Sequence, residues 1–531
     1  MIDLQKRINF EEFLDNYRDI KTTLKTSETA ETVEVSSAIS ALALAYEKVR
    51  NVIDYRDEHL IRRYAIEREL KRLFLQEDTF TSAERIIKTL IRGSYLPNVS
   101  IPITKVTELE QTLKKFENLR HSSTQKILIT PTFDSLTEYV IELASLEIEK
   151  LLVPTYTPEI PSVYMASVFE NNITLDNTND TNLWSVLVVS AHRAIHNSDT
   201  ATTKYFAFIL LTPQWENLNL EQVRLLDIES IRKNIDKLIN NPAFEKCLLL
   251  FRKHAPTFRT LEKVMLENLD DIDVLKDEEI LLRKSQLFLK KIYSTTREKL
   301  NRRLTRSIIY ILITKMALAI VLELPIDRYL EGRINPISLT INIITPPLIL
   351  FLIALTVKAP DDNDITNLLK VIKKLKEDNT ILPESKKVIV SFIQKNKTVV
   401  DYIFYGFYLL VTIFLLWISY IFLYAIGYNF ASYIIFLFFL SVVSYFGYTI
   451  ANSAAEYKVR NLNQGGFLTF LADSLSLPVI RMGRKLSEGV SKINLFVFIL
   501  DFIIESPFKL LVEFLEQWLS YVREKREETI A

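Results

Sequence analysis

Apolar residues follow two different patterns along the chain. Up to residue 306 they recur at helical spacing among many charged residues, as in the segment 39–75. Beyond residue 306 they gather in long continuous runs. The first pattern is typical of amphipathic helices around a soluble core, and the second is typical of helices that cross a membrane. We therefore expect an all-α protein with a large helical cytoplasmic domain, a four-helix transmembrane bundle and a C-terminal amphipathic helix.

Four apolar runs approach the roughly 20 residues that a helix needs to cross about 30 Å of hydrocarbon. They are residues 307–324, 338–357, 402–426 and 430–451, within a transmembrane domain predicted at 307–451. The first run is the shortest. Only Gly427, Tyr428 and Asn429 separate the last two runs, which predicts a tight antiparallel hairpin.

Basic residues in the connections indicate which side of the membrane each connection faces. Five lie at 297–306 just before the first run, two between the first and second runs, nine between the second and third runs, none in the hairpin turn, and six at 452–492 after the fourth run. Because cytoplasmic connections carry an excess of Lys and Arg, this alternation predicts a cytoplasmic N-terminus and a cytoplasmic C-terminal region.

The charged half divides at a stretch rich in Pro, Thr and Asn. This stretch, 155–183, reads as a loop between an N-terminal helical region at 1–154 and a second helical region at 184–306. From Thr257 onward the pattern favours one long linker helix that leads directly into the first apolar run. Residues 184–190 and 205–211 fit strands or buried helices equally well.

The segment 452–531 combines basic residues with an amphipathic pattern. Asp501, Glu505, Lys509 and Glu513 recur every four positions, which places them in one polar stripe on a helix. A helix lying in the cytoplasmic interface, or packed on the bundle, fits this stripe, and a fifth span is the alternative. The basic residues just before it suit anionic headgroups.

Composition narrows the possible functions. The 531 residues include 65 basic and 65 acidic ones, so the net charge of +0 gives no reason to expect a nucleic-acid partner. With nine glycines, the chain contains neither phosphate-binding loop motif, and broken-helix transporters are disfavoured as well. The single cysteine, Cys247, excludes an internal disulfide and reads as a buried thiol. The N-terminal residues lack the apolar region of a signal peptide.

Lys315 is the notable charge within the apolar runs. It lies eight residues into the first run, about 12 Å along a helix. Its ammonium group can extend toward the cytoplasmic side, pair with Asn342, Thr345 or Glu323, or line an ion or proton path. The other three runs contain no Asp, Glu, Lys or Arg, which argues against a pump. Pro346 and Pro347 in the second run predict a kink, either a static one or a gating hinge.

His192 and His196 have the best metal-site spacing in the chain. At i and i+4 they share one helical face, as metal sites require. However, Arg193 replaces the glutamate of the zinc-protease motif, and no third ligand is evident nearby. We therefore interpret them as surface or packing histidines, and we expect no cofactor and no enzymatic activity.

Several stretches, including INPISLTINIITPPLILF, FLSVVSYFGY, SLPVIRMGRKLSE and INLFVFILDFIIESPFK, resemble a known group. They are similar to uncharacterised integral-membrane proteins of candidate-phyla-radiation bacteria, over residues 307–515. The resemblance implies a bacterial cytoplasmic (inner) membrane, and it carries no activity and no site residues.

The sequence favours a non-enzymatic, membrane-anchored scaffold. Its partners would be the lipid bilayer and a protein bound through the cytoplasmic helices, or a second copy of the chain. The first alternative is an oligomeric channel or gated pore that uses Lys315, Asn342 and the Pro346–Pro347 kink. The second is a membrane enzyme with a metal at His192 and His196.

Overall fold

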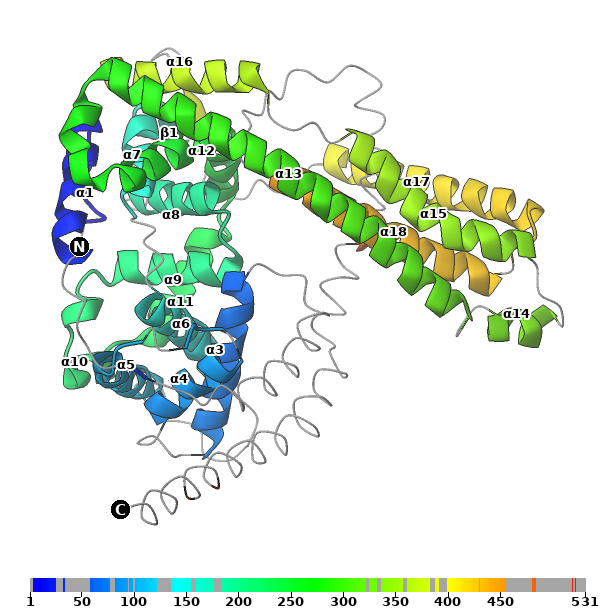
Figure 1. The fold of residues 1–531 in the computed structure, drawn as a ribbon, viewed down its shortest axis with the longest axis horizontal. Coiled ribbons are helices and arrows are strands. Elements are labelled where there is room, and N and C mark those ends of the chain that lie inside the picture. Colours follow the sequence, from blue (N-terminus) through cyan, green and yellow to red (C-terminus); the bar gives the residue numbers. More distant parts are fainter. Residues whose placement is uncertain are drawn as a thin grey trace, which may run out of the picture. The chain divides into compact units, whose positions relative to one another are not determined.

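The computed structural model describes residues 3–24, 32–33, 58–76, 82–93, 95–98, 101–121, 135–153, 159–175, 183–320, 324–331, 336–356, 361–382, 387–390, 399–428, 430–454, 480–483, 518 and 521. These residues are almost entirely helical (Figure 1). The elements up to residue 252 are α1 (Phe10–Leu24), α3 (Glu58–Gln76), α4 (Ser82–Arg92), α5 (Thr104–His121), α6 (Ser135–Leu152), α7 (Ile160–Glu170), β1 (Ile173–Leu175), α8 (Leu183–His196), α9 (Thr200–Leu211), η2 (Trp215–Asn217), α10 (Leu220–Arg224) and α11 (Ile228–Ile239). The later elements are α12 (Pro242–Glu267), η3 (Leu269–Lys276), α13 (Glu278–Leu318), α14 (Leu324–Glu331), α15 (Pro336–Thr356), α16 (Asp362–Asp378), β2 (Val388–Val390), α17 (Val399–Ala425) and α18 (Phe430–Ala454). The predicted all-α class is confirmed.

The chain forms two compact units. Unit 1 comprises Met1–Arg252, Asn379–Phe392 and Phe496–Ala531, and unit 2 comprises Lys253–Asp378 and Ile393–Leu495. The division falls inside α12. Each unit therefore has its own packing, described separately below.

Unit 1 is built around α6, which packs against α3, α5 and α9. Its apolar residues cover most of its circumference, and eleven of its residues are buried. α7 and α8 pack against each other and are buried along most of their length. β1 and β2 pair in parallel, with Ile173 opposite Val388 and Leu175 opposite Val390. This short pairing joins residues 387–390 to the rest of unit 1.

The predicted loop at 155–183 is wrong over much of its length, because α7 and β1 occupy 160–170 and 173–175. Pro161 lies in the first turn of α7, where a helix tolerates proline since the missing N–H would have no intrahelical partner. Tyr164, Met165 and Phe169 are buried. The segments that fit either strands or helices are helical, in α8 and α9.

A long helix leads into the first apolar run, but it begins at Glu278 and not near Thr257 as predicted. α12 ends at Glu267, and α13 starts at Glu278 and runs for 41 residues to Leu318. Between them Asp271 has non-helical dihedral angles, and the Asp277 side chain accepts hydrogen bonds from the N–H groups of Glu279 and Ile280. Because such a cap defines a helix start, Asp277 explains the new boundary.

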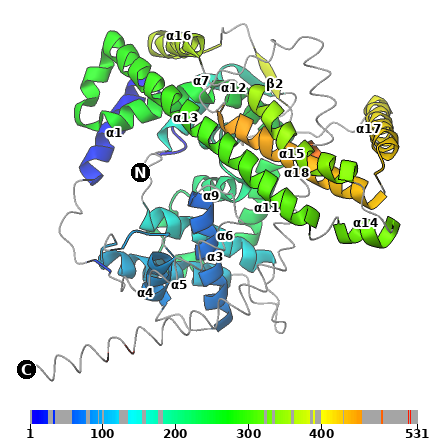
Figure 2. The same ribbon diagram turned by 45° about the vertical axis from the view of Figure 1, so that its right-hand side comes forward.

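The first part of α13 packs against α16, and its last part packs against α15 and α18. Figures 1 and 2 both show α15 and α18 beside this last part. α17 and α18 are joined by the predicted tight turn, in which Gly427 has a φ of 95°. This left-handed conformation suits glycine because it has no Cβ.

Two of the four predicted spans coincide with helices long and apolar enough to cross a membrane, at Gly406–Ala425 and Ser432–Ile450. The apolar part of α15, Leu339–Ile353, is shorter than such a span. α13 ends at Leu318, although the first span was predicted to continue to residue 324. By length and composition, the described residues therefore contain two candidate spans instead of four.

Candidate functional site

The three helices α13, α15 and α18 have a definite register. Leu300 and Leu304 of α13 pack against Ile450 near the end of α18, and Lys315 lies against Phe439, further toward its start. α13 and α18 are therefore antiparallel. The distances agree, since 11 residues separate Leu304 from Lys315 and 11 separate Phe439 from Ile450.

α15 runs parallel to α18. Near their starts, Ile341 packs against the cluster that contains Tyr433. Near their ends, a Cβ added to Gly447 would lie 2.8 Å from Cδ1 of Ile353. This distance is too short for two carbons in contact, so the glycine allows the two helices to approach closely. Gly447 was not singled out from the sequence, although it is the one glycine in the fourth apolar run.

Lys315 is fully buried in this bundle, and its Nζ lies 4.1 Å from the centroid of the Phe439 ring. The negative face of an aromatic ring attracts a cation, and the attraction is strongest where water is excluded. Asn342 of α15 is 1% exposed, so the bundle holds at least two buried polar side chains. The geometry therefore favours a lysine that is packed within the helices.

The other residues predicted to matter in the apolar runs and in the polar stripe have different outcomes. Pro346 and Pro347 are buried, and α15 continues through both of them without a break. Each proline lacks only its own N–H donor, so the other hydrogen bonds of the helix remain in place. Neighbouring helices support the segment. Glu323 lies outside the described residues, as do Asp501, Glu505, Lys509 and Glu513 of the predicted stripe.

The two histidines of α8 lie together inside unit 1. Their ring centroids are 4.7 Å apart, and His192 stacks on Phe206 with a centroid distance of 3.9 Å. Burial lowers the pKa of His192 well below its usual value, with a smaller contribution from His196. Among the described residues, no group of three or more His, Cys, Asp or Glu side chains is arranged to hold a metal ion. The stacking of His192 on Phe206 contributes aromatic packing between α8 and α9.

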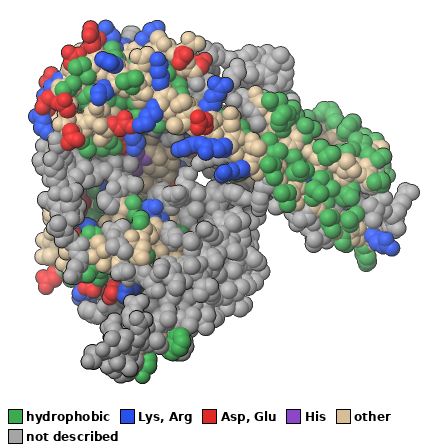
Figure 3. All heavy atoms as spheres, in the orientation of Figure 1, with side chains coloured by type: hydrophobic (Ala, Val, Ile, Leu, Met, Phe, Trp, Pro, Cys, Tyr) green, Lys and Arg blue, Asp and Glu red, His purple; other side chains and the backbone are tan. Residues whose placement is uncertain are grey.

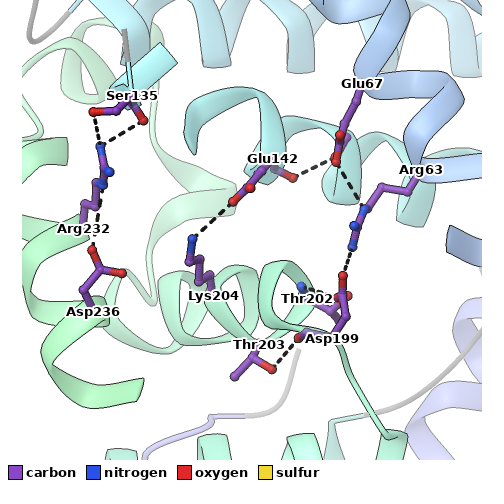
Figure 4. Close-up of polar contacts among 11 residues, drawn as sticks. Arg63, Glu67, Ser135, Glu142, Asp199, Thr202, Thr203, Lys204, Arg232 and Asp236 are labelled. Atoms are coloured by element: carbon purple, nitrogen blue, oxygen red, sulfur yellow. Dashed lines mark hydrogen bonds and ion pairs between the residues drawn. The ribbon is translucent and has the colours of Figure 1, made fainter. Parts of the chain in front are cut away.

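Ion pairs and hydrogen bonds form a network that joins four helices of unit 1 (Figure 4). The buried Arg63 of α3 contacts Asp199 at 2.6 Å, just before α9, and Glu67 on its own helix at 3.3 Å. Lys204 of α9 contacts Glu142 of α6 at 3.4 Å. In α11, Arg232 donates to the Ser135 carbonyl oxygen at the start of α6, at 2.9 Å. The spacing of these residues in the sequence gives no indication of this network.

The charges in this network affect one another. Burial acts to raise the pKa of Asp199, but the positive charge of Arg63 and hydrogen bonds from Thr202 outweigh it, so the pKa is lowered. For Glu67 the balance is reversed: burial outweighs the positive charge of Arg63, so the pKa of the Glu67 carboxyl group is raised. The Glu142 carboxylate adds to this rise by repulsion. The network therefore depends on Arg63, which two carboxylates share.

Glu262 is a buried acid in the part of α12 that belongs to unit 2. Its side chain is 2% exposed, and one carboxylate oxygen, Oε1, has no hydrogen-bond partner within the described part of the chain. Burial raises its pKa to about 7, although Lys263 and Arg259 act in the opposite direction. This group was missed in the sequence, where it is one of many glutamates in an amphipathic pattern.

Comparison of the chain with protein-family models, with curated proteins and with solved structures gave no match.

Proposed function

We propose that the protein is a membrane-anchored helical scaffold. The observation that carries the proposal is α13, a single helix whose charged first part packs with α16 and whose apolar last part packs with α15 and α18. One continuous helix therefore links soluble and apolar parts of unit 2 mechanically. Such a link suits a protein that holds a soluble helical region at a membrane.

The apolar surface supports membrane anchoring. α17 is exposed almost all round, with 6% of its candidate span buried, and apolar side chains form a continuous surface in this region (Figure 3). Toward the ends of the hairpin away from its turn lie Tyr402, Tyr408, Tyr445 and Tyr448, and near the turn lie Tyr420 and Tyr424. Tyr428 and Tyr433 are also near the turn but are buried. Aromatic belts of this kind occur at both membrane interfaces, where amphipathic rings are stable. Apolar residues fill the interval between the two groups.

The register of the bundle supports four spans in place of two. Because α15 follows α18 in parallel from Ile341 to Ile353, it covers nearly the same depth. From Leu304 to Leu318, α13 covers about 21 Å. We propose that the first two apolar runs cross together with the hairpin.

The proposed topology places both ends of the chain in the cytoplasm. The basic residues at 297–306 of α13, between α15 and α17 and after α18 support this orientation. The resemblance to integral-membrane proteins of candidate-phyla-radiation bacteria supports the bacterial cytoplasmic membrane as the location. The soluble helices then face the cytoplasm, where a protein partner or a second copy of the chain would bind.

The test uses the full chain in native membranes and in lipid nanodiscs. Alkaline carbonate extraction should leave the protein in the membrane fraction. Crosslinking in cells and native mass spectrometry should then give one defined oligomer or one defined partner complex. A monomer that crosslinks to no defined protein would remove the scaffold proposal.

A channel is the second candidate, because Lys315 and Asn342 are both buried inside the bundle. Ion flux into liposomes, compared between the wild type and Lys315→Leu at matched incorporation, separates the two functions. Flux that the substitution alters would support a channel with Lys315 on its path. Equal flux would retain the channel and assign the lysine a packing role. Absence of flux in folded protein would favour the scaffold.

A further inference from the structure

A short segment, Ile480–Gly483, contacts both helices of the hairpin. The guanidinium carbon of Arg481 lies 5.8 Å from the centroid of the Tyr408 ring on α17. Gly483 is buried against α18, where an added Cβ would overlap the carbonyl group of Ser441 and lie 2.8 Å from Cβ of Tyr445. Any other residue at 483 would displace the segment, because backbone atoms cannot move aside as a flexible side chain can. The close contact therefore holds Arg481 beside Tyr408.

The level of this contact follows from the hairpin. Counted from Gly427 in the turn, Tyr408, which Arg481 contacts, lies 19 residues back, about 28–29 Å along a helix. Gly483 contacts Ser441 and Tyr445, which lie 14 and 18 residues forward, so Gly483 lies deeper than Arg481. A bilayer has a hydrocarbon core of about 30 Å. If the hairpin spans the membrane as proposed above, on which this inference rests, Arg481 lies at the cytoplasmic headgroup level.

Arg481 and Tyr408 both have hydrogen-bond donors available to bind an anion. Arg481 is exposed, and no carboxylate pairs with it in the part of the chain that the structure describes. The hydroxyl of Tyr408 is shielded from solvent and has no hydrogen-bond partner within the same residues. A guanidinium group is always charged and binds phosphate through two parallel hydrogen bonds. A tyrosine hydroxyl donates a further one.

We propose that Arg481 and Tyr408 form a binding site for the phosphate of an anionic phospholipid in the cytoplasmic leaflet. Gly483 acts as the positioning residue, because it seats the segment against α18. A lipid phosphate is the anion present at this level in every membrane, and negatively charged lipids attract basic segments beside a span. The site would fix the segment after α18 to the membrane surface.

The experiment measures thermal unfolding of the purified full chain in a neutral detergent, with added phosphatidylglycerol, phosphatidylcholine or inorganic phosphate. Phosphatidylglycerol should raise the unfolding temperature of the wild type, and the other two additions should not. In Arg481→Gln the apparent affinity for phosphatidylglycerol should fall about fivefold, the factor that corresponds to about 1 kcal/mol. Tyr408→Phe should show a smaller loss. Arg481→Lys should lie between the wild type and Arg481→Gln, because it retains the charge without the paired hydrogen bonds.

Arg302→Gln is the matched control, because Arg302 is an exposed arginine of α13 that pairs with Glu298 at 3.7 Å. It should retain the wild-type response. Gly483→Val tests the positioning role, since it keeps Arg481 and should still weaken the lipid response. Equal responses of Arg481→Gln and the wild type would overturn the proposal. A response to inorganic phosphate as large as that to phosphatidylglycerol would overturn the assignment to a lipid.

Carbonate extraction of every variant separates this inference from the proposed function. A protein that is extracted from the membrane contradicts the anchoring itself. A protein that stays in the membrane and responds equally with and without Arg481 contradicts the lipid site alone.

Discussion

The Nζ of Lys315 lies 4.1 Å from the centroid of the Phe439 ring, and the lysine side chain is fully buried between three helices. Counted from Gly427, Phe439 is 12 residues into the hairpin, about 18 Å along the helix. In the proposed membrane orientation, this contact lies near the middle of the bilayer. A desolvated cation–π contact contributes about 2 kcal/mol, whereas removing an ion from water costs several kcal/mol. Burying the lysine therefore costs more free energy than its contact with Phe439 contributes.

We expect Lys315→Met to leave the free energy of unfolding unchanged within about 1 kcal/mol, or to raise it, because apolar replacements of buried charges are often neutral or stabilising. Lys315→Glu should lower it by more than about 3 kcal/mol, since a buried carboxylate would face the negative ring of Phe439. Unfolding by a denaturing detergent, followed by circular dichroism, measures both. A large loss in Lys315→Met would mean that the ammonium group is itself required for packing.

Gly447 permits the close approach of α15 and α18. Gly447→Val should lower the free energy of unfolding by about 1–3 kcal/mol, because its side chain would collide with Ile353. Gly406→Ala is the control, since nothing lies within 4 Å of a Cβ at that position. This control should be neutral or slightly stabilising, as alanine favours helices over glycine. The same detergent titration compares the two, and equal stabilities would contradict the close packing.

The hydrophobic pattern predicted the elements that depend on local sequence. It identified the hairpin, including the turn in which Gly427 adopts a φ of 95°, and the helix that links the soluble and apolar parts. Both follow from composition over a short window. The pattern extended the linker helix too far toward the N-terminus, because apolar spacing continues across 268–277. Asp277 caps the start of a new helix, so the helix is interrupted before it, but the spacing of the apolar residues stays the same.

The candidate site was only partly predictable. A lysine in an apolar run is visible in the sequence, but its partner Phe439 lies 124 residues away and depends on the register of two helices. The predicted alternatives, Asn342 and Glu323, were chosen because they are polar, whereas an aromatic face also binds a cation. In the same way, the proline and threonine content of 155–183 predicted a loop where α7 forms, although the interior of α7 is apolar and buried.

Asp199 has two roles, since it pairs with the buried Arg63 and its side chain accepts the N–H of Thr202 at the start of α9. Asp199→Asn should lower the free energy of unfolding by about 2 kcal/mol, because it removes the charge and keeps the cap. Asp199→Ala should lose about 1 kcal/mol more. Thermal unfolding of both variants at pH 7 gives the difference. Equal losses would show that the cap contributes nothing.

The pH dependence of the Asp199 contribution has a definite sign. The folded protein lowers the pKa of this acid, so its stabilisation is fully present above the unfolded pKa and is lost as pH falls through the folded pKa. The difference between the wild type and Asp199→Asn should therefore shrink in acid. A difference that stays constant down to strongly acidic pH would contradict the lowered pKa.

Glu262 should give the opposite pH dependence. Its pKa is raised to about 7 in the folded chain, so the folded state holds a proton that the unfolded state releases above about pH 4.5. Stability from this group is therefore present at low pH and is lost as pH rises from about 4.5 to about 7, by about 3 kcal/mol at most. Glu262→Gln cannot release this proton, so it should be more stable than the wild type at pH 8 and nearly equal to it at pH 4.5.

Unfolding temperatures measured across this range test the prediction. Glu267→Gln, an exposed position on the same helix, should leave the wild-type pH dependence unchanged. Parallel curves for the wild type and Glu262→Gln would mean that the pKa of Glu262 is the same in the folded and unfolded chain.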